Sequence, residues 1–401
     1  MAKRVFITGF GIISAIGDNA EQTLLSLAES KTGVGKISIL KTALAESHPA
    51  AEVLKTNDEL RTLAKLHDNR FYSRTALLGT IAARQALASA KMENGSGKRT
   101  GFISATSVGG MDRTEIFYET FSKDNSRGHL HDVITHDCGE STEAIASELG
   151  FNGYVDTIST ACSSSANAIM LGAKLIRQGI LDRVIAGGTD ALSRFTLNGF
   201  NSLMILDKQP CQPFDENRRG LNMGEGAGYI VLESEANEGL GQKNIFGELT
   251  GYANTNDAYH QTASSPDAKG AVMAIGQALA MAGIAPGQVD YINAHGTGTP
   301  NNDLTEETAF SKIFGQHIPP FSSTKAFTGH TLAAAGGIEA VISLLAINNG
   351  LIFPNLRYET KMKEFVFGPE TRLRKGLQLN HVLSNSFGFG GNNTSLLFSR
   401  V

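Results

Sequence analysis

Short apolar runs alternate along the first half of the chain with longer segments whose apolar residues recur at helical spacing. The runs predict buried strands, at residues 5–8, 100–105, 155–158, 181–190 and 229–233. Helical spacing predicts helices, at residues 58–66, 73–90, 143–149 and 163–178. Strands that alternate with helices predict an α/β fold with a mainly parallel sheet that is covered on both faces.

The pattern restarts after a polar, glycine-bearing stretch at residues 235–244. Residues 246–252 repeat the features of residues 5–10. Self-similarity of whole strand–helix units indicates a duplicated chain with two packed halves. We place these halves at residues 1–238 and 239–401.

A second repeat involves one strand–helix unit from each half. The strands at 155–158 and 321–324 are followed by helices at 163–178 and 332–349, which are rich in small and apolar residues. The helices end at Gly179 and Gly350. The ends of these two strands are therefore expected to occupy equivalent places in the two halves.

Composition and charge narrow the function classes. The chain has 401 residues and a formal net charge of −4, so neither nucleic acid nor an anionic membrane is expected as its main partner. The cysteines Cys138, Cys162 and Cys211 are odd in number and lack Cys-x-x-Cys spacing, which favours a reducing compartment over disulfides or zinc. With no signal peptide and no apolar span of the roughly 20 residues that a membrane helix needs, a cytoplasmic protein is expected.

Two segments have the composition of a ligand site, one of a metal site and one of a phosphate loop. Residues 112–139 are polar and contain His129, His131 and His136, but Lys, Arg and Asp surround them, so a loop with solvated histidines is expected instead of a metal site. Residues 220–228 are rich in glycine but precede a strand and lack a Lys-Ser/Thr ending, which argues against a phosphate loop.

Cys162 lies where a predicted strand turns into a predicted helix. Unpaired helix N–H groups and the helix dipole stabilise an anion there, which would lower the pKa of the thiol and produce a nucleophile. A buried structural cysteine is the alternative, because free cysteines are among the most buried residues.

His295 and His330 also follow glycine-flanked strand ends, and Lys325 lies close to His330 in the sequence. Sites of open α/β sheets form at the carboxyl ends of strands. If a pseudo-twofold axis relates the halves, these strand ends meet Cys162 in one cleft. One cysteine and two histidines in such places favour nucleophilic catalysis over structural roles.

Five motifs together resemble the β-ketoacyl-[acyl carrier protein] synthases of the thiolase superfamily, in the elongating class with a Cys-His-His triad. They appear in the family's order and cover nearly the whole chain: Thr160-Ala161-Cys162-Ser163, residues 293–299, Lys325 with Gly329-His330, residues 336–340 and residues 385–393. The resemblance implies a thiolase-like fold of duplicated αβ halves in a five-layered αβαβα arrangement.

The resemblance also implies a reaction and its residues. Cys162 would hold an acyl chain as a thioester in an oxyanion hole of the Cys162 and Phe389 N–H groups. His295 and His330 would stabilise the enolate left by decarboxylation of malonyl-acyl carrier protein, with Lys325 and Glu339 orienting them. Thr297, Thr299, Val108 and Phe389 would bind the substrate. Phe389 would also act as a gate over the acyl pocket.

Cofactors and partners follow from the same resemblance. No metal or organic cofactor is expected, because decarboxylation of the malonyl group drives the step. The substrates would be carried on the phosphopantetheine of acyl carrier protein. A homodimer is expected, with a heterodimer as the alternative. A basic patch for the carrier would involve Arg61, Lys65, Arg70 and Arg74, for which solvated surface charge is the equal alternative.

Other functions stay open or are disfavoured. A free-standing ketosynthase of a polyene or aromatic polyketide pathway, paired with a chain-length subunit, would use the same triad. Cys162 argues against the non-catalytic chain-length subunit itself, and no second cysteine after His381 supports a thiolase. Two departures from the family's pattern are a short, polar segment at residues 123–140 and Asn392 in place of a commoner Thr, where a mainly backbone role is expected.

Overall fold

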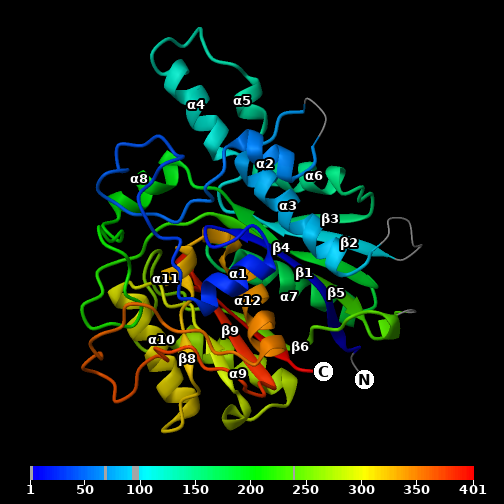
Figure 1. Cartoon of the computed structure of the whole chain (residues 1–401), viewed down its shortest axis with the longest axis vertical. Coiled ribbons are helices and arrows are strands. Elements are labelled where there is room, and N and C mark those ends of the chain that lie inside the picture. The colour runs from blue at the N-terminus through cyan, green and yellow to red at the C-terminus, as the bar shows by residue number, and fades with distance from the viewer. Residues whose placement is uncertain (1–2, 67–69, 93–98, 238–239) are drawn as a thin grey trace.

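The computed structural model describes residues 3–66, 70–92, 99–237 and 240–401, and the strands of this part of the chain form one ten-stranded sheet (Figure 1). Their order across the sheet is β3-β2-β4-β5-β1-β6-β10-β9-β7-β8. The first five are β1 (Val5–Ser14), β2 (Thr100–Ala105), β3 (Tyr154–Ile158), β4 (Arg183–Asp190) and β5 (Gly226–Ser234). The others are β6 (Gly247–Asn256), β7 (Tyr291–Asn293), β8 (Phe321–Ser322), β9 (His381–Gly388) and β10 (Asn392–Ser399).

The two halves of the sheet have the same strand order. Read from its outer edge, each half presents its third, second, fourth, fifth and first strand in chain order. The first strands, β1 and β6, pair antiparallel at the centre through Phe6 with Glu248 and Ile7 with Gly247. The predicted duplication is thus confirmed, whereas the predicted boundary between residues 238 and 239 lies outside the described residues.

Strand directions correct one expectation from the sequence. Pairing is parallel only where β2 meets β3 and β4, and where β7 meets β8 and β9. The neighbours from β4 through β5, β1, β6 and β10 to β9 pair antiparallel. A continuous apolar run shows only that a strand is buried on both faces of the sheet. In a layered fold, antiparallel strands are buried on both faces as parallel strands are, so the run does not reveal the strand direction.

The two halves of the sheet and three layers of helices form five layers (Figure 1). On the outer face of the first half lie α3 (Arg74–Ser89) and α6 (Cys138–Glu148), and on that of the second half lie α9 (Lys269–Ala282) and α10 (Pro300–Phe314). Between the halves lie α7 (Ser164–Arg177) and α12 (Ala335–Asn349), which carry much of the largest apolar cluster. This is the predicted αβαβα arrangement.

The central helix α12 corrects the expectation about apolar spans. The segment Leu332–Asn349 is long and apolar enough to cross a membrane, but 89% of it is buried inside the protein. Both sheet halves pack against α12, which accounts for apolar residues all round the helix. It is the core helix of the layered fold.

The segment predicted as a polar loop at residues 112–139 contains two helices before α6 begins. They are α4 (Met111–Phe121) and the one-turn α5 (His131–Ile134), which project from the body of the protein in Figure 1. No residue of α4 is buried, so this helix lacks the apolar stripe on which sequence periodicity depends. The remaining α-helices of the described residues are α1 (Ala20–Ala28), α2 (Asn57–Leu63), α8 (Arg194–Ser202) and α11 (Lys325–Thr328).

Candidate active site

The turn between β3 and α7 presents Cys162. Ala161, just before it, has φ of +53°, a left-handed conformation that a residue with a side chain adopts only under constraint. The Ser164 hydroxyl supplies such a constraint, because it accepts the Thr160 N–H at 2.7 Å. Cys162 is only 5% exposed, at the start of the central helix α7.

The environment of the Cys162 thiol overturns the expected lowering of its pKa. Burial raises the pKa of Cys162 to about 11, although the charge of Lys325 and the backbone N–H groups of Phe389 and Cys162 oppose the rise. Desolvation of the thiolate therefore outweighs the stabilising groups in the free protein. At neutral pH the resting group is a thiol.

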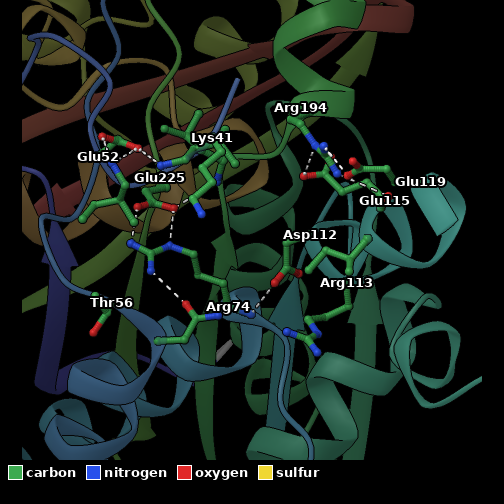
Figure 2. Close-up of a pocket in the computed structure, with 15 residues that line it drawn as sticks. Lys41, Glu52, Thr56, Arg74, Asp112, Arg113, Glu115, Glu119, Arg194 and Glu225 are labelled. Carbon is green, nitrogen blue, oxygen red and sulfur yellow. Dashed lines mark hydrogen bonds and ion pairs between the residues drawn. The ribbon is translucent and has the colours of Figure 1, made fainter. Parts of the chain in front are cut away.

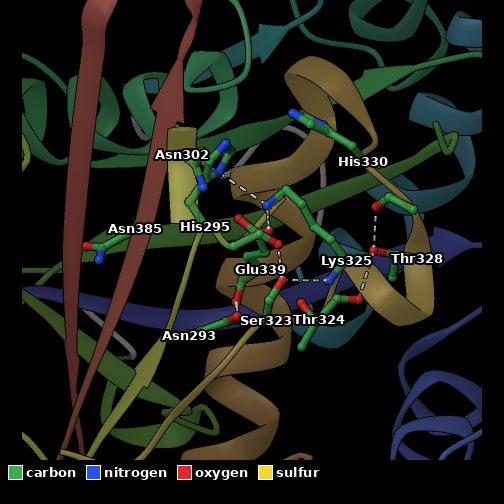
Figure 3. Close-up of polar contacts among 12 residues, drawn as sticks. Asn293, His295, Asn302, Ser323, Thr324, Lys325, Thr328, His330, Glu339 and Asn385 are labelled. Atoms are coloured by element: carbon green, nitrogen blue, oxygen red, sulfur yellow. Dashed lines mark hydrogen bonds and ion pairs between the residues drawn. The ribbon is translucent and has the colours of Figure 1, made fainter. Parts of the chain in front are cut away.

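His295 follows β7 and is held by both its backbone and its ring. The N–H groups of His295 and Gly296 donate to the Glu306 carboxylate at 2.9 and 2.8 Å. Lys325 Nζ lies 3.2 Å from Nδ1 of His295 (Figure 3). Because an ammonium can only donate, Nδ1 is the acceptor and the imidazole proton is on Nε2.

His330 reaches the same tautomer by a different contact. Its Nδ1 accepts the Leu332 N–H at 3.1 Å, so its proton is also on Nε2. The ring centroids of His295 and His330 are 5.5 Å apart with an interplanar angle of 87°. Burial and the charge of Lys325 hold the pKa of both imidazoles well below 6.5, which leaves two neutral N–H donors at neutral pH.

Lys325 and Glu339 form a buried ion pair beneath His295 (Figure 3). Burial raises the pKa of Glu339, and the contact with Lys325 opposes this rise. Oε2 of Glu339 and Oδ1 of Asn293 are buried without a hydrogen-bond partner. No group of His, Cys, Asp and Glu that could hold a metal ion occurs among the described residues.

A cavity of about 230 Å³ joins Cys162 to both histidines. Thr297 and Thr299 line it, with their hydroxyl oxygens 2.8 Å apart. The other lining residues are Cys162, Phe200, Ile205, Leu221, Thr262, Ala263, Ser264, His295, Pro300, Asn301, Asn302, His330, Phe387, Gly388 and Phe389.

Three predicted site residues lie outside this lining. Lys325 lies behind His295 and contacts its ring, and Glu339 contacts Lys325. Val108 packs against the apolar cluster that includes Leu197 and Leu332. The structure therefore places Val108 in the wall next to the cavity, not on its surface.

Phe389 has two contacts at the cavity. Its backbone N–H lies beside the Cys162 thiol and opposes the rise in the pKa of that thiol. Its ring stacks on Phe200 of α8, with centroids 5.7 Å apart and planes at 14°. Sequence reasoning missed Phe200, because no local pattern on an amphipathic helix indicates which distant aromatic ring it meets.

A second cavity, of about 420 Å³, does not contain the nucleophile (Figure 2). Arg74 lines it and is buried at 7% exposure in an ion pair with Glu225 at 2.6 Å. The Arg74 guanidinium also donates to the Val53 and Lys55 carbonyls, which ties α3 to the chain before α2. The expectation of Arg74 in a surface basic patch is therefore wrong.

Comparison with known proteins identifies the family. A profile described as the N-terminal domain of β-ketoacyl synthase matches residues 2–238, and one described as its C-terminal domain matches residues 246–359. The chain belongs to the β-ketoacyl synthase family. It is accordingly an acyltransferase with a thiolase-like fold.

Relatives of this ketosynthase match it over its whole length. It is 34% identical to "3-oxoacyl-[acyl-carrier-protein] synthase 2" of Staphylococcus aureus strain N315, over 99% of this chain and 98% of the relative. The protein of that name from Synechocystis sp. is also 34% identical, with the same coverage.

Two solved structures share the fold closely. "The ishigamide ketosynthase/chain length factor" has a TM-score of 0.94 and 30% identity, with 100% of both chains covered. "Ketosynthase (ApeO) in Complex with its Chain Length Factor (ApeC) from Xenorhabdus doucetiae" has a TM-score of 0.85 and 32% identity, covering 100% of this chain and 98% of that one.

Proposed function

We propose that this protein catalyses the decarboxylative Claisen condensation of malonyl-acyl carrier protein with an acyl chain held on Cys162. One observation carries the proposal: the Cys162 thiol, with backbone N–H groups beside it, shares a cavity with the Nε2–H donors of His295 and His330. The product is a 3-oxoacyl-acyl carrier protein, as in fatty acid elongation.

Acyl transfer uses the nucleophile turn. Cys162 sulfur attacks the carbonyl carbon of the incoming thioester, and its proton leaves with the departing phosphopantetheine thiol. The N–H groups of Phe389 and Cys162 stabilise the negative oxygen of the tetrahedral intermediate. The outcome is an acyl thioester on Cys162 and a free carrier thiol.

Condensation uses the histidine pair. When the carbon–carbon bond to the malonyl carboxylate breaks, its electron pair forms an enolate whose oxygen accepts from the Nε2–H groups of His295 and His330. The enolate carbon then attacks the acyl thioester, and Cys162 leaves as the thiolate. Carbon dioxide is the second product, and no metal or organic cofactor takes part.

The carrier arm enters through the polar side of the cavity. Thr297 and Thr299 supply hydroxyl groups for the amides of phosphopantetheine, and Ser264 and Asn301 lie at the same wall. We assign the role of substrate gate to Phe389, whose ring leaves Phe200 when an acyl chain enters.

A second candidate is a ketosynthase of a polyene or aromatic polyketide pathway. The observation that favours it is the TM-score of 0.94 to the ishigamide ketosynthase/chain length factor. Both candidates share the chemistry and differ in partner and product length. Elongation of a defined primer, with and without a chain-length subunit, separates them through the lengths of the products.

We further propose a cytoplasmic dimer. β3 is an edge strand of the described sheet, and the nearby α4–α5 segment exposes Tyr118, Leu130 and Ile134 by 60% or more. An open edge beside exposed apolar side chains fits a second, similarly built chain. A homodimer suits the fatty acid role, and a heterodimer with a chain-length subunit suits the polyketide role.

Mass spectrometry of the intact protein tests the reaction. After incubation with acyl-acyl carrier protein, the mass should rise by one acyl group, located on Cys162. Addition of malonyl-acyl carrier protein should remove that mass and yield a 3-oxoacyl carrier. A protein that never becomes acylated by carriers of any chain length would contradict the proposal.

A further inference from the structure

Asn392 occupies the end of the loop that carries Phe389. Asn392 is the first residue of β10 and pairs with Gly388, the last residue of β9, so the two enclose the loop of residues 389–391. This residue is half-buried and has no place in the mechanism above. Its surroundings, however, connect it to the nucleophile.

The side-chain oxygen of Asn392 accepts three hydrogen bonds. Donors are the Ser163 hydroxyl at 2.6 Å, Asn167 Nδ2 at 3.0 Å and Asn254 Nδ2 at 2.6 Å. Ser163 directly follows Cys162, Asn167 belongs to α7, and Asn254 belongs to β6. One amide oxygen therefore joins the nucleophile turn of the first half to the sheet of the second half.

Further contacts make this a closed network. Thr394 donates to Asn167 Oδ1 at 2.8 Å and accepts from Asn254 Nδ2 at 2.8 Å. Asn167 Nδ2 also donates to the Thr160 hydroxyl at 2.8 Å. Ser163 and Thr394 are fully buried. Without the Asn392 oxygen, the Ser163 hydroxyl keeps only the Thr160 carbonyl at 2.8 Å as its acceptor, and the amides of Asn167 and Asn254 each lose one hydrogen bond inside the protein.

At its other end, the loop lies directly against the nucleophile turn. A Cβ on Gly388 would lie 3.1 Å from the Thr160 carbonyl oxygen and 3.2 Å from the Cys162 nitrogen. Only a glycine allows this approach without displacement of the turn. Gly388 and Asn392 thus fix both ends of the loop relative to Cys162, and the Phe389 N–H lies between them.

We propose that Asn392 is a positioning residue that aligns the Phe389 N–H with the Cys162 sulfur, and so sets the oxyanion hole for acyl transfer. The expectation of a mainly backbone role at this position is replaced by a side-chain role. This inference rests on the proposed function. The histidine pair stands outside the Asn392 network, because Lys325 and Leu332 orient its rings.

The two half-reactions provide the test. Acyl transfer to Asn392→Ala, measured by mass spectrometry with acyl-acyl carrier protein, should be slower by about tenfold or more, since full loss of an oxyanion-hole donor costs about 100-fold to 1,000-fold. Carbon dioxide release from malonyl-acyl carrier protein, measured with Cys162→Ala and with Cys162→Ala/Asn392→Ala, should agree within about twofold, because the hole is not needed for that step. Asn348→Ala, which removes two hydrogen bonds on α12 far from the loop, is the matched control for acyl transfer.

Each outcome decides the inference. Equal losses in acyl transfer and decarboxylation would overturn it, since that result indicates general damage to the fold, and so would unchanged acyl transfer. Asn392→Asp retains an acceptor oxygen of the same shape and should restore most of the acyl transfer rate, which also keeps the test valid if the alanine variant does not fold. If the unaltered protein itself does not become acylated, the proposed function has failed instead.

Discussion

Nζ of Lys325 lies 3.2 Å from Nδ1 of His295, and both side chains are buried. The same ammonium group forms an ion pair with Glu339 on α12. Lys325 therefore fixes the proton of His295 on Nε2, while the Glu339 carboxylate balances a charge that burial would otherwise disfavour. This relationship connects the central helix of the fold to a hydrogen-bond donor that lines the cavity with Cys162.

Replacement of Lys325 by Met should separate chemistry from stability. Without the ammonium, His295 loses its fixed tautomer, and carbon dioxide release should fall by about 100-fold, comparable to loss of one preorganised donor. Glu339 becomes an unpaired buried acid, so the free energy of unfolding, measured by urea denaturation, should fall by about 3 kcal/mol. Lys325→Met/Glu339→Gln removes both charges and should regain much of that stability without regaining decarboxylation. Recovery of decarboxylation in the double variant would contradict the role given to Lys325.

Cys162→Ala should abolish one half-reaction and spare the other. The variant has no atom that can form a thioester, so no acyl mass should appear on the intact protein. Its histidine pair and cavity remain, so malonyl-acyl carrier protein should still lose carbon dioxide. His330→Ala is the reciprocal variant and should retain acyl loading better than decarboxylation. Acylation of Cys162→Ala at any other residue would disprove the assignment of the nucleophile.

The two half-reactions should depend on pH differently: acylation should accelerate as pH rises, and decarboxylation should not change. Because the pKa of Cys162 is raised to about 11, the thiolate fraction grows about tenfold per pH unit between pH 7 and 9, and acylation should accelerate accordingly. The histidines have lowered pKa values and are neutral throughout that range, so decarboxylation by Cys162→Ala should be flat above about pH 6.5. Rates from stopped samples, corrected for hydrolysis without protein, provide the measurement. A decarboxylation rate that falls steeply between pH 7 and 8 would contradict the neutral state of the two histidines.

Charged substitutions in α5 and at the residue before it test the proposed dimer. Leu130 and Ile134 are 75% and 60% exposed, so aspartate at both positions costs the isolated chain little. In a dimer that covers them, the same charges would be buried without partners. Light scattering should show a dimer for the unaltered protein and a monomer for Leu130→Asp/Ile134→Asp, with unchanged circular dichroism. A dimer in both samples would place the interface elsewhere.

Local sequence was sufficient to single out the candidate site residues. Cys162 and His295 stand beside small residues in the turns after β3 and β7, whereas His330 follows Gly329 after the short helix α11 and not directly after a strand, as the sequence had indicated. Glycines and small residues mark such turns in the sequence because turns depend on nearby residues. The repeated strand–helix units likewise predicted the duplicated fold. Helix α3 and strand β2 were also predictable, since 11 of the 16 residues of α3 and the last five residues of β2 are buried, and such burial needs the apolar residues that the sequence displays there.

The tertiary structure alone determined how these groups behave. Burial reversed the expected pKa shift of Cys162, because desolvation depends on every atom packed around the thiol and not on its position before a helix. The antiparallel core of the sheet, the Phe200–Phe389 stack and the bonds to Asn392 join residues far apart in sequence. The sequence by itself determined which side chains could react. The packing of the two halves decided their protonation, their partners and the cavity that they share, because each of these depends on distances through space.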